Sequence, residues 1–160
     1  MKKLVLITIA LVFAAISISA QEYGGFKKGY SANISTGLGI SVSKTDPANF
    51  VSITTSHGYS FGDGMYVGGG IGLEPQINGH AARIPIYFES KYNIEKSTLS
   101  PFVDCRMGCN YIIGYDSIRY FLSPGVGFDY HRLSYRINYI CETGGNFKKH
   151  AISFTTGINF

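Results

Sequence analysis

Three cysteines carry the most reactive side chains in this 160-residue chain. Cys105 and Cys109 lie four positions apart, so an extended strand would separate their Cα atoms by ~13 Å at about 3.3 Å per residue. A disulfide needs Cα atoms within ~7 Å, so these two residues cannot bridge each other in a strand. Cys141 lies in a later segment, and no histidine is close in sequence to complete a metal site. We interpret all three as small apolar side chains and expect no metal and no cofactor.

The histidines are the candidate general bases. An imidazole can activate a serine only within hydrogen-bond reach, which a strand provides when serine follows histidine by two positions. That spacing is absent, because the residues two positions after His57, His131 and His150 are Tyr59, Leu133 and Ile152. Ser134 follows His131 by three positions and would point to the opposite face, and His80 falls in a loop. We therefore predict no catalytic residue and no enzymatic activity.

Five charged residues form the third candidate group: Glu89, Lys91, Asp104, Arg106 and Arg136. Pairing their segments about the short connection 95–98 predicts Glu89 beside Asp104, with Lys91 and Arg106 diagonally adjacent. Arg136 comes from a later segment, where its expected neighbour is Gly125. Two interpretations remain open. The group is either a structural ion network that fills an interior, or a proton or ion path of the kind that buried charges in membranes can mark. We favour the structural network.

The elements that would position these residues are strands, because apolar side chains recur at every second position. In the segment 30–43 the even positions are mostly apolar, and the odd positions are serine, asparagine and glycine. Seven further segments alternate in the same way: 51–61, 65–73, 82–94, 99–111, 120–130, 133–141 and 150–160. Eight strands of this kind account for most of the chain after its first thirty residues.

The distribution of charge between the two faces gives the environment of the strands. None of the apolar-face positions in these eight segments is Asp, Glu, Lys or Arg, whereas the alternate face carries charges and small polar residues. A charged residue that faces hydrocarbon at the bilayer midplane costs about 2–4 kcal/mol. A soluble sandwich or lipocalin places its apolar face inward instead. The pattern therefore predicts an all-β fold, an eight-stranded antiparallel up-and-down transmembrane β-barrel whose apolar face contacts lipid.

The connections predict an orientation. Those at 62–64, at 95–98 and near His131 are short, and those at 44–50, 74–81, 112–118 and 142–149 are longer. Outer-membrane barrels have short periplasmic turns and longer external loops, so we expect both termini in the periplasm. Proline removes a ladder donor. We expect Pro85 and Pro101 near strand ends and a bulge at Pro124. Three glycines, at 68, 70 and 72, leave one wall thin and predict a narrow interior pocket.

The first twenty residues predict a cleaved signal peptide. Lys2 and Lys3 precede an apolar run over 4–16, and small residues precede the expected cleavage site after Ala20. A retained anchor is the alternative, but the run falls short of the ~20 residues that a membrane span needs. Residues 21–160 then form one domain. Without Lys2 and Lys3, 12 of the 14 basic residues remain against 10 acidic ones, which gives no basis for a nucleic-acid partner.

The C-terminal segment resembles a signal found in outer-membrane proteins. Phe154, Thr156, Ile158 and Phe160 alternate up to a terminal aromatic residue, which resembles the signal that barrel-assembly machinery recognises in outer-membrane proteins. The segments 83–87 (RIPIY) and 123–127 (SPGVG) are similar to recurrent strands of the small eight-stranded outer-membrane β-barrel domain family, which includes PorT-type and outer-membrane-protein-X-type barrels. The resemblance implies Phe154, Ile158 and Phe160 as an assembly signal and an outer-membrane location, and it carries over no activity.

Four functions remain open on these grounds. The first is a non-enzymatic structural or surface-interaction barrel, which we favour. The others are a lipid-modifying enzyme similar to a lipid A deacylase, an accessory barrel of a secretion or adhesion system, and a soluble ligand carrier. The expected partners are outer-membrane lipid, lipopolysaccharide and, during biogenesis, the barrel-assembly machinery. The sequence gives no oligomeric state.

Overall fold

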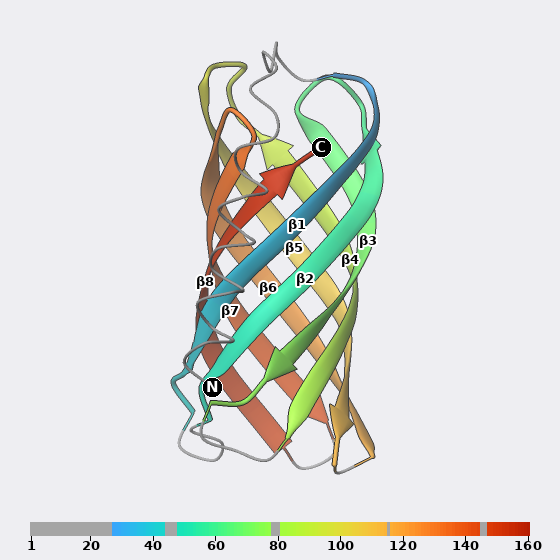
Figure 1. Ribbon diagram of the computed structural model, residues 1–160, viewed down its shortest axis with the longest axis vertical. Helices are drawn as coiled ribbons and strands as arrows, with labels where there is room; N and C mark the ends of the chain where they lie inside the picture. The colour runs from blue at the N-terminus through green and yellow to red at the C-terminus, as the bar shows by residue number, and fades with distance from the viewer. Residues whose placement is uncertain (1–26, 44–47, 78–80, 115, 145–146) are drawn as a thin grey trace, which may run out of the picture.

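The computed structural model describes residues 27–43, 48–77, 81–114, 116–144 and 147–160, which form a closed β-barrel of eight antiparallel strands (Figure 1). Each strand pairs with its neighbour in sequence, and β1 pairs with β8 to close the sheet. The strands are β1 (Gly29–Ser41), β2 (Phe50–Ser60), β3 (Met65–Pro75), β4 (Ala82–Asn93), β5 (Leu99–Ile113), β6 (Ser117–Tyr130), β7 (Leu133–Gly144) and β8 (Phe147–Asn159). The predicted fold class is confirmed, and the signal peptide and its boundary at residue 20 lie outside the described residues.

The two ends of the barrel differ. The rim that holds the start of β1 and the end of β8, at the top of Figure 1, is here called the terminal rim. The opposite rim holds the β1–β2 and β3–β4 connections and is called the loop rim. At the terminal rim, Phe160 and Ala32 exchange two backbone hydrogen bonds of 2.8 and 3.2 Å. The C-terminal residue therefore takes part in closing the barrel.

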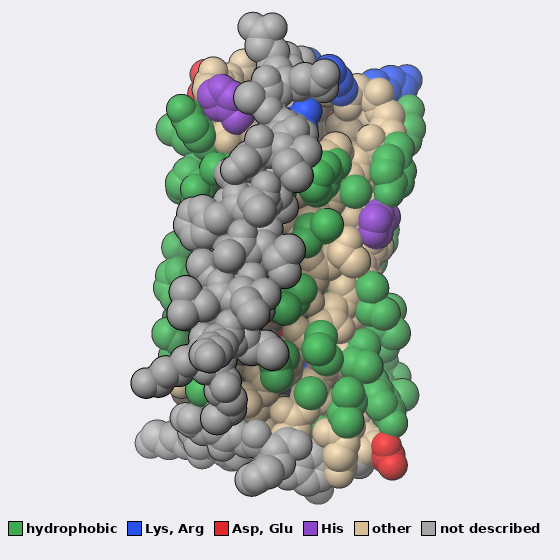
Figure 2. All heavy atoms as spheres, viewed as in Figure 1, with side chains coloured by type: hydrophobic (Ala, Val, Ile, Leu, Met, Phe, Trp, Pro, Cys, Tyr) green, Lys and Arg blue, Asp and Glu red, His purple; other side chains and the backbone are tan. Residues whose placement is uncertain are grey.

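The alternation of faces follows the sequence pattern in every strand. Large apolar side chains point outward and are about half exposed, as at Ile34, Val103 and Ile137. The alternate positions point into the lumen, where most side chains are polar and buried. Between the rims, hydrophobic side chains cover much of the described part of the face shown in Figure 2, and the charged groups visible there gather mainly at the ends. No described residue belongs to a helix long and apolar enough to cross a membrane.

Two of the four connections expected to be long are short. Only three residues separate β5 from β6, between Ile113 and Ser117, and only two separate β7 from β8, between Gly144 and Phe147. The strands extend further than predicted because the alternation continues through residues first assigned to loops, including Glu142. At the terminal rim, the two-residue turn between Tyr130 and Leu133 matches the expected position, and His131 adopts a positive φ of 56° there.

The predicted bulge at Pro124 is absent. The pairs Leu122↔Cys141 and Gly125↔Asn138 keep one register on both sides of the proline. Pro124 pairs with Cys105 on its other side, so it lies inside an otherwise regular strand. The proline only removes the backbone donor that would face Tyr139. Pro85 interrupts the β3–β4 ladder in the same way, between Ile71↔Ile86 and Glu74↔Arg83.

The predicted interior pocket beside Gly68, Gly70 and Gly72 is filled by aromatic side chains. A Cβ atom added at Gly70 would lie 2.3 Å from the Tyr87 ring, and one at Gly68 would lie 2.3 Å from the Tyr66 hydroxyl. The glycines therefore make room for these two rings. The small size of the glycines had suggested open space and did not indicate that aromatic side chains occupy it. A cavity of about 30 Å³ remains among the polar side chains near the terminal rim.

Candidate functional site

The charged residues of the lumen are positioned by the β4–β5 register. Glu89 lies opposite Arg106, and Lys91 lies opposite Asp104. The sequence-based pairing was wrong by two residues, because the turn after β4 is centred one position later than assumed and includes a hydrogen bond from the Ile94 amide to the Pro101 carbonyl. The true register places opposite charges directly across the two strands, which stabilises the pair.

A central ion cluster brings together four of the five predicted residues: Glu89, Asp104, Arg106 and Arg136. Glu89 Oε1 accepts a hydrogen bond from Arg136 at 2.8 Å and contacts Arg106 at 3.5 Å. Arg136 Nε also lies 3.4 Å from Asp104 Oδ2. Arg136 sits opposite Gly127 on β6, not Gly125 as expected, and therefore reaches across the lumen to β4. All four residues are buried.

The fifth predicted residue, Lys91, belongs to a second cluster near the terminal rim. Its ammonium group contacts Asp129 at 2.8 Å. Asn93 and Asn159 donate hydrogen bonds to the same carboxylate at 2.8 and 3.2 Å. Lys91 also lies 4.7 Å from the centre of the buried Phe102 ring. Asp129 was not placed in the network from the sequence.

A third cluster near the loop rim escaped the sequence analysis. Arg83 contacts Glu74 at 2.9 Å and Glu142 at 3.0 Å, and its guanidinium stacks 4.0 Å from the centre of the Phe50 ring. Both carboxylates had been assigned to loops. Continuing the two-residue alternation past Gly72 and past Asn138 would have placed Glu74 and Glu142 on the lumen side. The alternation in the sequence was therefore sufficient to predict their position.

The three clusters fill the lumen with compensating charges. They contain five acidic side chains, Glu74, Glu89, Asp104, Asp129 and Glu142. Four basic side chains pair with them, Arg83, Lys91, Arg106 and Arg136, and the buried Lys149 ammonium donates to the Ala48 carbonyl at 3.0 Å. Because these groups contact one another across the lumen, the arrangement suits a plug better than a channel.

The outer face carries the cysteines and two of the histidines. Cys105, Cys109 and Cys141 are free thiols on the outward positions of β5 and β7. Within the described ranges, no group of three or more His, Cys, Asp or Glu side chains is placed to hold a metal ion. His131 lies in the terminal-rim turn, where its ring contacts Tyr130, and His80 lies outside the described residues.

His57 belongs to a hydroxyl–imidazole group that the sequence analysis missed. Its Nε2 lies 3.0 Å from the Thr55 hydroxyl, and its Nδ1 lies 2.5 Å from the Tyr30 hydroxyl. The predicted spacing has a serine two positions after a histidine, whereas Thr55 precedes His57 by two positions on the same face. A second outward pair joins His150 Nδ1 to the Tyr139 hydroxyl at 3.1 Å. Among the described residues, neither imidazole contacts a carboxylate that could hold the imidazolium formed in nucleophilic catalysis.

Solved structures provide the comparison for this geometry. The chain resembles the outer membrane enzyme PagL with a TM-score of 0.63 and 12% identity, over 79% of this chain and 98% of that one. It resembles Neisserial surface protein A with a TM-score of 0.59 and 16% identity, over 82% and 97% of the two chains. The N-terminal β-barrel domain of Pseudomonas aeruginosa OprF gives a TM-score of 0.56 at 14% identity, over 84% and 100%.

The chain has the fold of the small eight-stranded outer-membrane β-barrels. No protein-family model matches it, and no curated protein matches it in sequence. The resemblance to the small-barrel group is therefore supported at the level of the fold, without a choice between PorT-type and outer-membrane-protein-X-type barrels. Because the similar structures include both an enzyme and proteins of other roles, the fold leaves the activity open.

Proposed function

We propose that this protein is a non-enzymatic integral protein of the outer membrane, with a structural or surface-interaction role and a closed lumen. The observation that carries the proposal is the segregation of charge. The ion pairs of the described barrel lie in the lumen, and most outward positions between the rims are apolar. In water this arrangement would expose a continuous apolar surface around the whole barrel, whereas in a bilayer that surface contacts hydrocarbon.

The membrane assignment is tested by spin labels on the outer face. Labels at Ile34, Val103 and Ile137 of the folded protein should be accessible to oxygen and protected from a water-soluble relaxation agent. A label at Glu95, exposed in a terminal-rim turn, is the matched control and should show the opposite preference. A change in gel mobility on boiling reports that each labelled barrel is folded. Water-exposed labels at the three outward positions of a folded barrel would rule the proposal out.

The orientation in the membrane is part of the proposal. Both ends of the described barrel meet at the terminal rim, and the two longest connections lie at the loop rim. We place the terminal rim in the periplasm and the loop rim at the cell surface. An epitope inserted in the connection between Pro75 and Ala82 should then bind antibody on intact cells, and one inserted between Ser60 and Met65 should not. The reverse result would invert the orientation.

The last strand supports a role in biogenesis. Phe154 and Phe160 point outward from β8 and are about half exposed, and Ile158 lies between them on the same face. With the terminal backbone pairing of Phe160, they suit capture of β8 by strand addition to the assembly machinery. Substituting Phe160 by serine should then slow appearance of the heat-modifiable form in cells more than it changes the stability of the folded barrel.

A lipid-modifying enzyme is the second candidate, and the Thr55–His57–Tyr30 group is the observation that favours it. It places a hydroxyl beside an imidazole on the lipid-facing side of a barrel whose fold resembles that of PagL. Mass spectrometry of lipid A from cells that express the protein tests this candidate. A change in acylation that His57→Ala abolishes would replace the non-enzymatic proposal, and unchanged lipid A supports it.

A further inference from the structure

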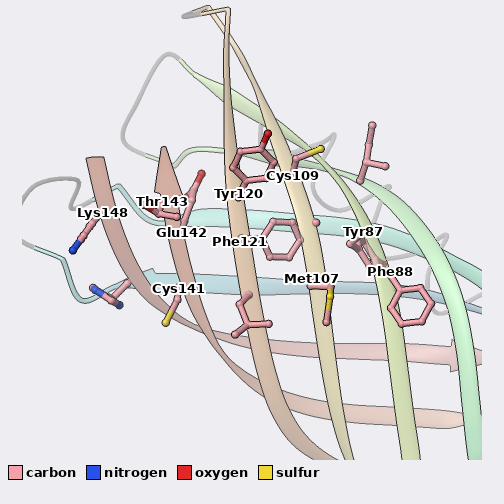
Figure 3. Close-up of a pocket in the computed structure, with 14 residues that line it drawn as sticks. Tyr87, Phe88, Met107, Cys109, Tyr120, Phe121, Cys141, Glu142, Thr143 and Lys148 are labelled. Carbon is pink, nitrogen blue, oxygen red and sulfur yellow. The ribbon is translucent and has the colours of Figure 1, made fainter. Parts of the chain in front are cut away.

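A groove of about 800 Å³ runs across the outer face of strands β4 to β8 (Figure 3). Two neighbouring rows of cross-strand pairs form its sides. One row leads from Phe88 through Met107 to His150, and the other leads from Ile86 to Lys148. Each row crosses four strand spacings of about 4.8 Å, so the groove extends over roughly 19 Å. This elongated shape suits a single extended hydrocarbon chain.

Small side chains keep the groove open. Cys109, Cys141 and Thr143 occupy outward positions in the two rows between bulkier neighbours. Tyr120, which is 67% exposed, stands beside Cys109 as one wall, and Met107 stands on the other side. Figure 3 shows the two sulfur atoms of Met107 and Cys109 and the Tyr120 ring along neighbouring strands. The groove therefore exists because small side chains occupy these outward positions between larger ones.

The two ends of the groove differ in chemistry. Phe88 and Ile86 line the end at the middle of β4, whereas Lys148 and His150 line the end near the start of β8, at the loop rim. Lys148 is exposed, and the Tyr139 hydroxyl orients the His150 ring through the 3.1 Å contact at Nδ1. The carboxylate of Glu142, which also borders the groove, is buried and pairs with Arg83. The groove thus joins an apolar end to a cationic end.

We propose that this groove binds a phosphate-bearing lipid of the leaflet at the loop rim. The acyl chain lies along the apolar end, and the phosphate lies at Lys148 and His150, both of which offer N–H donors to an anion. In the orientation proposed above, that leaflet is the outer one, so the lipid is the phosphorylated lipid A portion of lipopolysaccharide. The inference rests on the proposed function, because the groove faces lipid only in a membrane-spanning barrel.

Native mass spectrometry of the full-length barrel purified from membranes tests the proposal. The probes are lipid A and its dephosphorylated form, which share their acyl chains and differ in the phosphates. We expect wild type to prefer the phosphorylated probe, and Lys148→Gln to reduce that preference about tenfold, since a hydrogen bond to a charged group contributes at least the equivalent of one decade in affinity. Lys28→Gln, which removes an exposed cation at the terminal rim, is the matched control and should leave the preference unchanged.

A second variant tests the site of the acyl chain. Cys109→Phe fills the middle of the groove and should weaken binding of both probes, whereas Cys105→Phe, one position outside the groove on the same face, should not. The gel shift on boiling confirms that each variant is folded. A folded wild type that binds both probes equally, or equal effects of Lys148→Gln and Lys28→Gln, would overturn the inference alone. A wild type without the gel shift would overturn the proposed membrane barrel as well.

Discussion

At the scale of single residues, Glu89 is the centre of the lumen. Its carboxylate contacts two guanidinium groups, those of Arg106 and Arg136, which come from different strands. All three groups are buried, so each has lost its hydration. Removing any one of them would leave another buried charge without a partner, which destabilises the folded barrel. The pair directly across the strands, Glu89 with Arg106, has the longer contact, and the pair across the lumen has the shorter one.

We expect Glu89→Ala to lower the free energy of unfolding by about 3–5 kcal/mol, because it leaves two buried guanidinium groups without their shared carboxylate. Urea titration in lipid vesicles, read by the mobility of the folded band, measures the change. Glu95→Ala removes the same charge from an exposed turn and should change stability by less than about 0.5 kcal/mol. Equal stabilities of the two variants would show that the central cluster contributes nothing.

At the scale of the strands, the side-chain alternation was sufficient to predict which residues face the lumen. Arg83, Asp104 and Arg136 all lie on the predicted side. Register was not predictable in the same way. A turn shifted by one position moves every cross-strand pair by two residues and keeps each residue on its face, so the pattern of Glu89, Lys91, Asp104 and Arg106 is equally consistent with both pairings. The end of β7 was missed because its polar residues, beginning with Glu142, were read as loop, and Ile112 and Ile113 at the end of β5 were assigned to the same kind of connection.

Adjacent glycines on β3 give a matched pair of variants. We expect Gly70→Ala to destabilise the barrel by about 1–3 kcal/mol, because the new Cβ would overlap the buried Tyr87 ring. Gly69 points to the outer face, where a Cβ would meet only the Tyr87 carbonyl oxygen, at 3.5 Å. Gly69→Ala should therefore be neutral or slightly stabilising. The same urea titration compares them, and a cost at Gly69 equal to that at Gly70 would contradict the seating of Tyr87.

Replacing Pro124 is expected to stabilise the barrel. Pro124→Val restores a backbone N–H opposite Tyr139 in a strand whose register is already correct. We expect stability to rise by about 0.5–1.5 kcal/mol, the net contribution of one hydrogen bond. Pro85→Val should act in the same direction on the β3–β4 ladder. Destabilisation by both substitutions would show that the prolines shape the strands in a way that the constant register does not reflect.

At the scale of the whole molecule, buried side chains occupy the lumen along the barrel axis. Aromatic rings of Phe50 and Phe102 are fully buried inside it, and both lie against charged groups, at 4.0 Å from Arg83 and 4.7 Å from Lys91. The plug is therefore distributed along the axis and does not depend on one constriction. This distribution favours the structural interpretation of the charges over a continuous ion path.

We expect Arg106→Ala to lower the temperature of unfolding without changing conductance. The substitution removes a buried partner of Glu89, but Arg136, Phe102 and Arg83 still occupy the lumen on either side. Planar bilayer recordings should show the same low current for wild type and variant, and loss of the heat-resistant band should occur at a lower temperature for the variant. A large single-channel current in the variant would instead favour the ion path.

The bridges between β4 and β7 also constrain the order of events during insertion. Arg83 with Glu142, and Arg136 with Glu89, join strands that are not neighbours in the sheet. A flat or partly curled intermediate cannot form them, and Arg136 and Glu142 would then face hydrocarbon without these partners. Hairpins entering the bilayer one after another would therefore meet a steep energetic barrier. We therefore expect the strands to insert and the barrel to close in a single concerted step.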